Sequence, residues 1–325
     1  MPELGFALSS EEHPPQELVR WAVRAEETGF AYALISDHYH PWTDRQGQSP
    51  FVWSVIGAIA QATDRLRLGT GVTCPTIRIH PGLVAQAAAT AAALMPGRFF
   101  LGVGSGENLN EHIFGAYWPS ADERQEMLEE AIAVIRQLWQ GGYQTYRGKH
   151  YRVENARIYT LPEELPAIAV AAAGPEAAEL AASVGDALIS TSPDGDLVDT
   201  YLNAGGDGPR YGQLTVCFGK DEREAVKTAL EWWPNAALKG ELGQELPLPR
   251  HFEQAAANVT EEDIAEVIVC GPDVDRYLEK ITEFEDAGFD HVYIHQVGAD
   301  QEGFLKFAER ELLVDASDSM RKGSV

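Results

Sequence analysis

Residues 32–40, which read YALISDHYH, decide the expected fold because an apolar run passes directly into polar side chains. The run Tyr32–Ser36 has the length and the aromatic and aliphatic content of a β-strand. Asp37, His38 and His40 follow it at once. In barrels built from parallel strands, the residues just past each strand carry the chemistry. We therefore expect a strand here, with functional side chains at its carboxyl end.

Seven other runs of this kind recur along the chain, and helical stretches separate most of them. The further strands that we expect are Leu4–Leu8, Leu66–Val72, Arg98–Val103, Ile168–Ala172, Ala187–Thr191, Gln213–Phe218 and Asp290–His295. The expected helices include Pro14–Gly29, Phe51–Ala62, Gly82–Leu94, Ala121–Trp139 and Phe304–Leu313. Strands that alternate with helices predict right-handed βαβ units and a parallel sheet. Eight units that close on themselves predict an α/β fold of the (β/α)8 TIM-barrel type.

Two longer segments predict insertions after the fourth and seventh strands. Residues 141–156 have the pattern of a small β-ribbon, and residues 219–288 contain far more chain than one crossover helix needs. We expect a single barrel domain over residues 1–315 and a disordered tail over residues 316–325. An open doubly wound sheet is the alternative, but residues 9–12 (SSEE), after the first strand, lack the glycines of a phosphate loop.

The composition is globular, with a large excess of acidic side chains. The 325 residues include 50 Asp and Glu against 25 Lys and Arg, which gives a net charge of −25. This charge repels nucleic acids and anionic membranes, so we expect neither as a partner. Cys74, Cys217 and Cys270 form no disulfide framework or metal-binding pattern. No signal peptide is visible and the apolar run Leu83–Met95 is too short to span a bilayer, so we expect a cytoplasmic protein.

Barrel closure brings the residues after the strands to one face, so positions far apart in the sequence are expected to meet there. These positions are Glu11, Asp37, His38, His40, Trp42, Gly71, Val72, Cys74, Ser105, Gly106, Glu107, Asn110, Ala173, Gly174, Thr191, Ser192 and His295. Imidazole, carboxylate and indole groups on one rim suit proton transfer. Structural roles stay open for Asp37 as a turn cap, for Glu107 as a carboxylate at a helix N-terminus, and for Trp42 in surface packing.

Two motifs point to chemistry that the rest of the sequence does not support. Residues 102–107 (GVGSGE) resemble a dinucleotide-binding loop, but Glu107 stands where the third glycine belongs and would repel a pyrophosphate. His38 and His40 have the spacing of a metal pair at a strand end. Further ligands are missing, because no histidine follows strands five and six and His295 replaces the expected aspartate after strand eight. We therefore expect no metal.

Four segments, taken in order, resemble the luciferase-like barrel superfamily, and within it the group around the coenzyme F420-dependent glucose-6-phosphate dehydrogenases. They are Ser36-Asp37-His38 with Pro41-Trp42, then LGTGV at residues 68–72, GVGSGENLNE at residues 102–111, and AAGP at residues 172–175. The resemblance runs from about Leu4 to Thr191 and resumes at Asp290–Gln301. It implies an oxidoreductase that binds coenzyme F420, a deazaflavin.

The resemblance also implies roles for individual residues. Cofactor contacts are implied at Asp37, Gly71, Val72, Cys74, Ser105, Gly106, Asn110, Ala173, Gly174, Glu176 and Ala177. In hydride transfer between the deazaflavin and an alcohol, carbonyl or imine, His38 is implied as the base and Glu107 as the acid. Trp42 and Glu11 would lie near the reacting atoms, and Gly71–Val72 would be a non-prolyl cis peptide. Cys74 replaces the usual hydroxyl residue, and because a thiol is a weaker donor, cofactor affinity is expected to be modestly lower.

On the substrate side the resemblance implies Thr191, Trp42 and His295, but the basic residues expected around a sugar phosphate are missing. Asp194 stands where a lysine is usual, and no basic residue occurs in residues 265–271 in place of an arginine. A second lysine falls near residues 242–243, with Lys239 the closest candidate. Phosphate recognition uses Arg or Lys. We therefore expect an uncharged alcohol, ketone, sugar or imine, and poor activity on glucose 6-phosphate.

Two alternative functions, an oligomeric state and the segments beside the substrate are also expected. An FMN-dependent luciferase-like monooxygenase and a non-catalytic barrel are the alternatives to an F420-dependent enzyme. A homodimer packed through barrel helices is expected from the resemblance alone. The loop over residues 193–212 and the insertion over residues 221–258 are expected to line the substrate side, with Trp232, Trp233 and His251 as walls.

Overall fold

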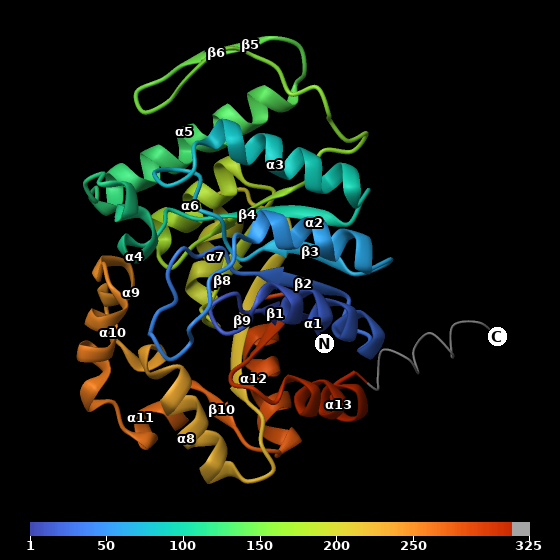
Figure 1. The fold of residues 1–325 in the computed structure, drawn as a ribbon, viewed down its shortest axis with the longest axis vertical. Helices are drawn as coiled ribbons and strands as arrows, with labels where there is room; N and C mark the ends of the chain where they lie inside the picture. The colour runs from blue at the N-terminus through green and yellow to red at the C-terminus, as the bar shows by residue number, and fades with distance from the viewer. Residues whose placement is uncertain (314–325) are drawn as a thin grey trace, which may run out of the picture.

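The computed structural model describes residues 1–313 and shows a closed barrel of eight parallel strands (Figure 1). The strands are β1 (Glu3–Leu8), β2 (Tyr32–Ile35), β3 (Arg67–Thr70), β4 (Phe99–Val103), β7 (Ile168–Ala171), β8 (Ala187–Ser190), β9 (Arg210–Cys217) and β11 (His291–Gln296). The predicted (β/α)8 barrel is confirmed. The expected tail over residues 316–325 lies outside the described residues, and the single domain over residues 1–315 stays a prediction.

One principal helix follows each barrel strand and packs on its outer side. These helices are α1 (Pro15–Thr28), α2 (Val52–Ala62), α3 (Pro81–Leu94), α5 (Ala121–Trp139), α6 (Pro175–Val184), α7 (Gly195–Asn203), α12 (Val274–Asp286) and α13 (Gln301–Glu311). Helix α7 corrects one expectation, because residues 193–212 were expected to form a loop beside the substrate. Asp194 accepts a hydrogen bond from the backbone N–H of Leu197 and so begins this helix.

Side chains alternate between the barrel interior and the layer beneath the helices, as the two-residue period of a strand requires. In β2, Tyr32 and Leu34 pack inside the barrel, whereas Ala33 and Ile35 belong to the core under the helices. The rings of Phe100 and Tyr211 stack inside with their centroids 5.1 Å apart. These rings fill the lower part of the barrel, and a cavity lies above them toward the carboxyl ends of the strands.

The insertion after β4 contains the expected β-ribbon, formed by the antiparallel strands β5 (Gln144–Arg147) and β6 (Arg152–Ala156). The ribbon lies beyond helices α3 and α5 in Figure 1. It also reaches the barrel rim, because the hydroxyl of Tyr151 donates to the carbonyl of Thr76 at 2.9 Å. The short helix α4 (Asn108–Glu111) stands between β4 and α5.

The insertion after β9 builds a helical cluster beside the barrel mouth. It contains α8 (Glu222–Trp232), the 3-10 turn η2 (Pro234–Ala237), α9 (Leu242–Glu245), α10 (Pro249–Ala255), α11 (Glu261–Val267) and the strand β10 (Val269–Cys270). Strand β10 was not foreseen from the sequence, because a two-residue strand carries no detectable alternation. Helix α9 reaches across to α4, where the side-chain N–H of Asn108 donates to the carbonyl of Glu245 (Figure 1).

The barrel wall is interrupted between β8 and β10. Strand β8 pairs with β9 only up to the pair Ser190–Gly212, and β10 pairs with it only from Val216 onward. Along residues 213–215 of β9, no strand of residues 1–313 forms a ladder on that side. On the other side, β11 pairs with β9 without a break. Within residues 1–313 no helix combines the length and apolar character needed to cross a bilayer.

Gly102 tests how closely β3 and β4 approach each other. A Cβ added at Gly102 would collide with the backbone carbonyl oxygen of Thr70, which cannot move without breaking the sheet. Gly102→Ala should therefore lower the free energy of unfolding by more than about 3 kcal/mol, measured by urea denaturation. The control is Gly57→Ala in the interior of α2, where nothing lies within 4 Å of the added Cβ. Because alanine favours a helix, that change should stabilise by roughly 0.5–1 kcal/mol. Equal stability of the two variants would contradict the close approach.

Candidate active site

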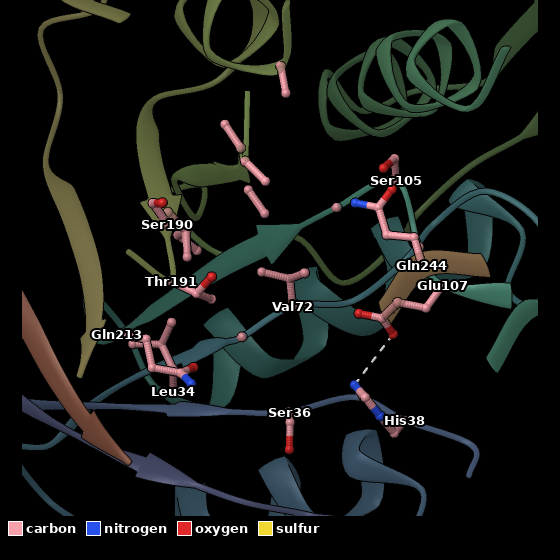
Figure 2. Close-up of a pocket in the computed structure, with 18 of the residues that line it drawn as sticks. Leu34, Ser36, His38, Val72, Ser105, Glu107, Ser190, Thr191, Gln213 and Gln244 are labelled. Atoms are coloured by element: carbon pink, nitrogen blue, oxygen red, sulfur yellow. Dashed lines mark ion pairs between the residues drawn. The ribbon is translucent and has the colours of Figure 1, made fainter. Parts of the chain in front are cut away.

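A cavity of about 600 Å³ opens at the carboxyl ends of the barrel strands. Figure 2 shows His38 and Glu107 on one side of it and Thr191 and Gln213 on the other. Most of the residues predicted for the site line this cavity: Glu11, His38, Trp42, Gly71, Val72, Ser105, Gly106, Glu107, Ala173, Gly174, Glu176, Ala177, Thr191 and His295. The geometry therefore gathers predicted residues from seven of the eight barrel strands around one space.

His38 lies between two carboxylates that come from different parts of the chain. Its Nδ1 is 3.2 Å from Oε1 of Glu11, which follows β1, and its Nε2 is 3.6 Å from Oε2 of Glu107, which precedes α4 (Figure 2). His38 and Glu11 are almost completely buried, whereas the Glu107 side chain keeps 30% of its surface exposed. The imidazole therefore has a buried carboxylate behind it and an accessible one in front.

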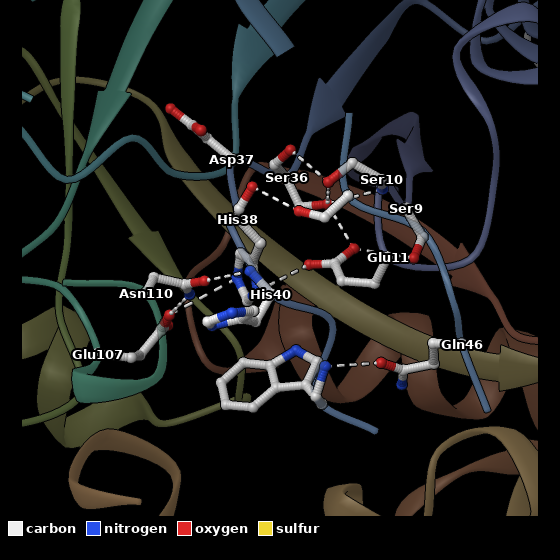
Figure 3. A network of polar contacts seen from close by, with 12 residues as sticks. Ser9, Ser10, Glu11, Ser36, Asp37, His38, His40, Gln46, Glu107 and Asn110 are labelled. Atoms are coloured by element: carbon white, nitrogen blue, oxygen red, sulfur yellow. Dashed lines mark hydrogen bonds and ion pairs between the residues drawn. The ribbon is translucent and has the colours of Figure 1, made fainter. Parts of the chain in front are cut away.

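Hydroxyl groups hold the Glu11 carboxylate in its buried position. The Ser36 hydroxyl donates to Oε2 of Glu11 at 2.6 Å and the Ser9 hydroxyl donates to the same atom at 3.0 Å (Figure 3). Burial raises the pKa of Glu11, but the neighbouring His38 and these hydroxyl donors lower it more, so the net pKa lies below its ordinary value. Glu11 is therefore an anion at neutral pH and stabilises positive charge on the imidazole.

Asn110 fixes Glu107 relative to the segment that carries His38. Its side-chain N–H donates to Oε2 of Glu107 at 2.9 Å, while its carbonyl oxygen accepts from the backbone N–H groups of Tyr39 and His40 (Figure 3). Asn110 itself does not line the cavity. Asn110, which was predicted to contact the cofactor, therefore links Glu107 to the backbone that follows His38.

Asp37 and Cys74 also lie behind the cavity wall. Arg78, with its side chain 6% exposed, donates to Oδ1 of Asp37 at 3.0 Å and approaches Oε1 of Glu111 at 3.5 Å. Thr73 donates to the second oxygen of Asp37. Burial raises the pKa of Glu111, and burial likewise raises the pKa of the Cys74 thiol. Asp37 and Cys74 therefore belong to the buried layer that supports the loops of the cavity wall.

Small residues form a flat wall on the side of β3, β4 and β7. Gly71, Val72, Gly104, Gly106 and Ala173 line it, and the peptide bond between Gly71 and Val72 is cis. Gly106 has a φ of +88°, and a Cβ there would collide with the Cys74 sulfur. A Cβ at Gly174 would project into open space. This wall leaves room for a planar group to lie against the backbone.

At the end beside α5 and α6, the cavity is lined by the positively charged side chain of Arg124. Arg124 is the one Lys or Arg among residues 1–313 that lines it. Its side chain is 3% exposed, and its guanidinium contacts Glu245 at 3.4 Å, Gln244 at 3.1 Å and the ring of Trp118. The Nε of Arg124 is buried and meets no acceptor within the described part of the chain. Gly174 and Pro175 begin helix α6 at this end, so its backbone N–H groups add positive partial charge.

Trp42 covers the mouth above His38. Its ring contacts the His38 ring edge-on at 5.1 Å and packs against Phe252 of α10 at the same distance. Of the three walls expected from the insertion, only Trp233 lines the cavity; Trp232 instead stacks on Arg45, and His251 lines neither described cavity. Nδ1 of His40 donates to the backbone carbonyl of Leu109 at 2.9 Å, and His40 does not line the cavity.

Sequence reasoning missed a second group of lining residues: Leu34, Ser36, Arg124, Gln125, Ser190, Gln213, Gln244 and Tyr293. The strand residues among them had a usable signal, because Gln213 and Tyr293 occupy inward positions of the two-residue alternation. Arg124 and Gln244 had none, because their position depends on how α5 and α9 pack. No cluster of three or more metal-ligating side chains occurs within residues 1–313.

Comparisons with known proteins identify relatives that cover nearly the whole chain. A family model described as luciferase-like monooxygenase matches residues 2–291. The F420-dependent glucose-6-phosphate dehydrogenase of Microbacterium testaceum (strain StLB037) is 37% identical over 322 residues, which is 95% of this chain and 96% of that protein. The protein of the same name from Nakamurella multipartita is also 37% identical over 322 residues, with 95% of each chain covered.

Solved structures give the same result for the fold. An F420-dependent secondary alcohol dehydrogenase in complex with an F420–acetone adduct matches with a TM-score of 0.89 and 28% identity, over 95% of this chain and 98% of that chain. The coenzyme F420-dependent tetrahydromethanopterin reductase from Methanopyrus kandleri matches with a TM-score of 0.76 and 21% identity, over 95% and 98%, and shows the fold alone. By the extent of the family match and the identity to its relatives, this chain belongs to the luciferase-like monooxygenase family.

Proposed function

We propose that this chain is a coenzyme F420-dependent oxidoreductase that transfers a hydride between the deazaflavin and an alcohol, carbonyl or imine. The observation that carries this proposal is His38, which lies between Glu11 and Glu107 beside a flat, small-residue wall. Relatives at 37% identity and a structural neighbour at 28% identity are named for F420-dependent dehydrogenation. The expected homodimer and cytoplasmic location remain part of the proposal.

The cavity has the shape and donors that a phosphate-bearing deazaflavin needs. A volume of about 600 Å³ lies within the usual range of cofactor sites. Gly71, Val72 and Gly106 would hold the ring, and Arg124 with the first N–H groups of α6 would hold the phosphate. The deazaflavin supplies two-electron hydride chemistry when bound. Cofactor contacts from Asp37, Cys74 and Asn110 stay predictions, since these side chains lie behind the wall.

His38 is proposed as the base that removes the substrate hydroxyl proton during oxidation. The Glu11 carboxylate lies 3.2 Å from Nδ1, so it stabilises the imidazolium as that proton arrives on Nε2. Glu107 is accessible, held by Asn110 and 3.6 Å from Nε2 of His38, which suits it to move a proton beside that nitrogen. In the reducing direction His38 donates and Glu107 accepts. Trp42 and Phe252 exclude water from above.

The charges around the substrate end favour an uncharged substrate. Glu11 and Glu107 line the cavity beside His38, whereas Arg124, its one cation among residues 1–313, lies at the α5 and α6 end, where Glu176 occupies the first turn of α6. Asp194 is engaged as the N-terminal cap of α7. Beside His38 a dianionic phosphate would therefore meet carboxylates, and the Arg276 and Lys280 of the adjoining cavity each contact a carboxylate already. We propose that glucose 6-phosphate is a poor substrate, although the curated relatives are named for it.

Replacement of His38 separates catalysis from cofactor binding. His38→Ala should lower kcat by at least about 1000-fold with a panel of alcohols, because the base is lost, while F420 affinity changes by less than about threefold. Stopped-flow absorbance measures turnover, and fluorescence titration measures affinity for F420 and FMN. Parallel loss of turnover and binding would assign His38 to binding. Tight binding of FMN with weak binding of F420 would support the monooxygenase alternative.

Arg124→Met tests the anionic end of the cavity. Loss of a charge-assisted hydrogen bond should weaken F420 binding by about 10- to 100-fold. Affinity for the deazaflavin chromophore without its phosphate tail should not change, and this ligand controls for damage to the fold. Equal weakening for both ligands would show that Arg124 acts only through the structure.

The lowered pKa of Glu11 predicts a pH-dependent contribution to stability. Its folded pKa lies below the ordinary value of 4.5, so the contribution is complete above that pH and is lost as pH falls through the folded value. The difference in unfolding free energy between wild type and Glu11→Gln should therefore be largest near about pH 7 and shrink below about pH 4.5. Urea denaturation across this range measures it. A difference that does not vary with pH would contradict the assignment.

A further inference from the structure

The end of the cavity that contains Arg124 carries more negative than positive charge. Arg124 of α5 is its one Lys or Arg within residues 1–313, and this side chain is 3% exposed. Oε1 of Glu245, in α9, lies 3.4 Å from the Arg124 guanidinium, and Glu176 lines the same end from the first turn of α6. One cation and a partial charge of about +0.5 at the start of α6 therefore face two carboxylates.

Other elements fix the Glu245 carboxylate beside Arg124. The indole N–H of Trp118 donates to both of its oxygens at 3.1 Å, and the backbone carbonyl of Glu245 accepts from the side chain of Asn108. Helix α9 accordingly lies next to α4 (Figure 1). Glu245 does not itself line the cavity, so it acts on a ligand there through Arg124 and through its own charge.

Most of the Arg124 guanidinium is already bonded to the protein. One terminal nitrogen donates to the carbonyl of Pro119 at 2.7 Å, and the other donates to Oε1 of Gln244 at 3.1 Å. The Nε is buried and meets no acceptor within residues 1–313. Of the three guanidinium nitrogens, Nε is therefore the one left without a protein partner in this part of the chain, beside a cation that Glu245 partly neutralises.

We propose that Glu245 and Glu176 make this end of the cavity selective for a phosphate that carries one negative charge. This inference rests on the proposed function, in which Arg124 and the start of α6 hold the cofactor phosphate. The phosphodiester of coenzyme F420 carries one charge, whereas a phosphomonoester such as that of FMN carries about 1.5 to 2 at pH 7. Because Glu245 partly neutralises Arg124, the second charge of a monoester gains little attraction and is repelled by both carboxylates. The two carboxylates are therefore specificity-determining residues that favour F420 over FMN.

Two ligands that differ in phosphate charge test this selectivity. Both carry the deazaflavin chromophore, but one ends in a phosphomonoester and the other in the methyl phosphodiester. At about pH 8 the wild-type protein should bind the diester at least about tenfold more tightly, because the monoester brings a second negative charge to the Arg124 end. Fluorescence titration measures both affinities, and the chromophore without phosphate gives the baseline.

The pH dependence of the same two affinities gives a second measurement on the wild-type protein. The second pKa of a phosphomonoester is about 6, so below that pH both ligands carry one charge. The ratio of diester affinity to monoester affinity should therefore fall toward about one between about pH 8 and about pH 5.5. The charged groups facing this end are Arg124 of α5, Glu176 of α6 and Glu245 of α9. His38 and Glu107, at the ring, act on both ligands alike and cancel in the ratio.

Charge-removing variants assign the selectivity to these carboxylates. Coulomb energy is proportional to ligand charge, so if Glu245→Gln tightens diester binding about fivefold, it should tighten monoester binding about 25-fold. Glu176→Gln should act in the same direction. Glu129→Gln is the matched control, because it removes the same charge from an exposed position of α5 that lines neither cavity. It should change each affinity by less than about twofold.

The outcomes distinguish this selectivity from the function on which it rests. If the wild-type protein binds the two ligands equally at pH 8, or if the ratio does not vary with pH, the selectivity is overturned while F420-dependent turnover stands. If Glu245→Gln changes both affinities by the same factor, Glu245 acts only through the position of α9 and the proposal for it is wrong. If F420 does not bind, or if reduced F420 transfers no hydride to a panel of ketones and imines, the proposed function itself fails, whatever the ratio.

Discussion

One imidazole placed between two carboxylates fixes how the loops at the carboxyl ends of β1, β2 and β4 lie relative to one another. His38 has Glu11 on its Nδ1 side and Glu107 on its Nε2 side, at 3.2 Å and 3.6 Å. A neutral imidazole has one N–H and can turn a proton toward only one of these carboxylates, whereas an imidazolium turns a proton toward both. Under the proposed function, this arrangement would let His38 exchange a proton with Glu107 while Glu11 supplies a fixed negative charge.

The surrounding loops keep this geometry from relaxing. Arg78 joins Asp37, which directly precedes His38, to Glu111, which lies one turn after Glu107. Asn110 adds a neutral link between Glu107 and the backbone after His38. A buried ion pair contributes little net stability, but breaking one by removing a partner is costly. The cluster around Arg78 is thus better understood as fixing the positions of two loops than as a source of stability.

The sequence was sufficient for those parts of the molecule that follow from local patterning. Eight apolar runs separated by amphipathic stretches predicted the barrel, and polar residues after the runs predicted Glu11, His38 and Glu107 as site residues; these three side chains line one cavity. Asp37 and Asn110 also follow strands but do not line the cavity, because Asp37 is held by Arg78 behind the wall and Asn110 lies on α4, where its side chain bonds Glu107.

What the sequence did not reveal depends on contacts between distant elements. Arg124 lies on the first turn of α5, and only the packing of α9 and α6 around it makes it a cavity residue. The wall is interrupted beside Gln213 because β8 pairs with the first part of β9 and β10 with its last part. The sequence could not predict this, since a strand of two residues shows no alternation. Glu11 and Glu12 are adjacent in the sequence, yet in the turn after β1 their side chains contact different histidines, His38 and His295.

The charge distribution gives the two ends of the cavity different ligand preferences. A net charge of −25 repels anions over the whole surface, so any anionic group must be held by donors placed beside it. At one end such donors are the first N–H groups of α6 and Arg124, which contacts one carboxylate, that of Glu245, and keeps a buried Nε without an acceptor in the described part of the chain. At the other end, both cations beside Gln213 are paired and carboxylates outnumber them. An elongated anionic cofactor and an uncharged substrate would therefore enter in one relative orientation, with the cofactor's charged tail toward α5 and the substrate toward β8, β9 and β11.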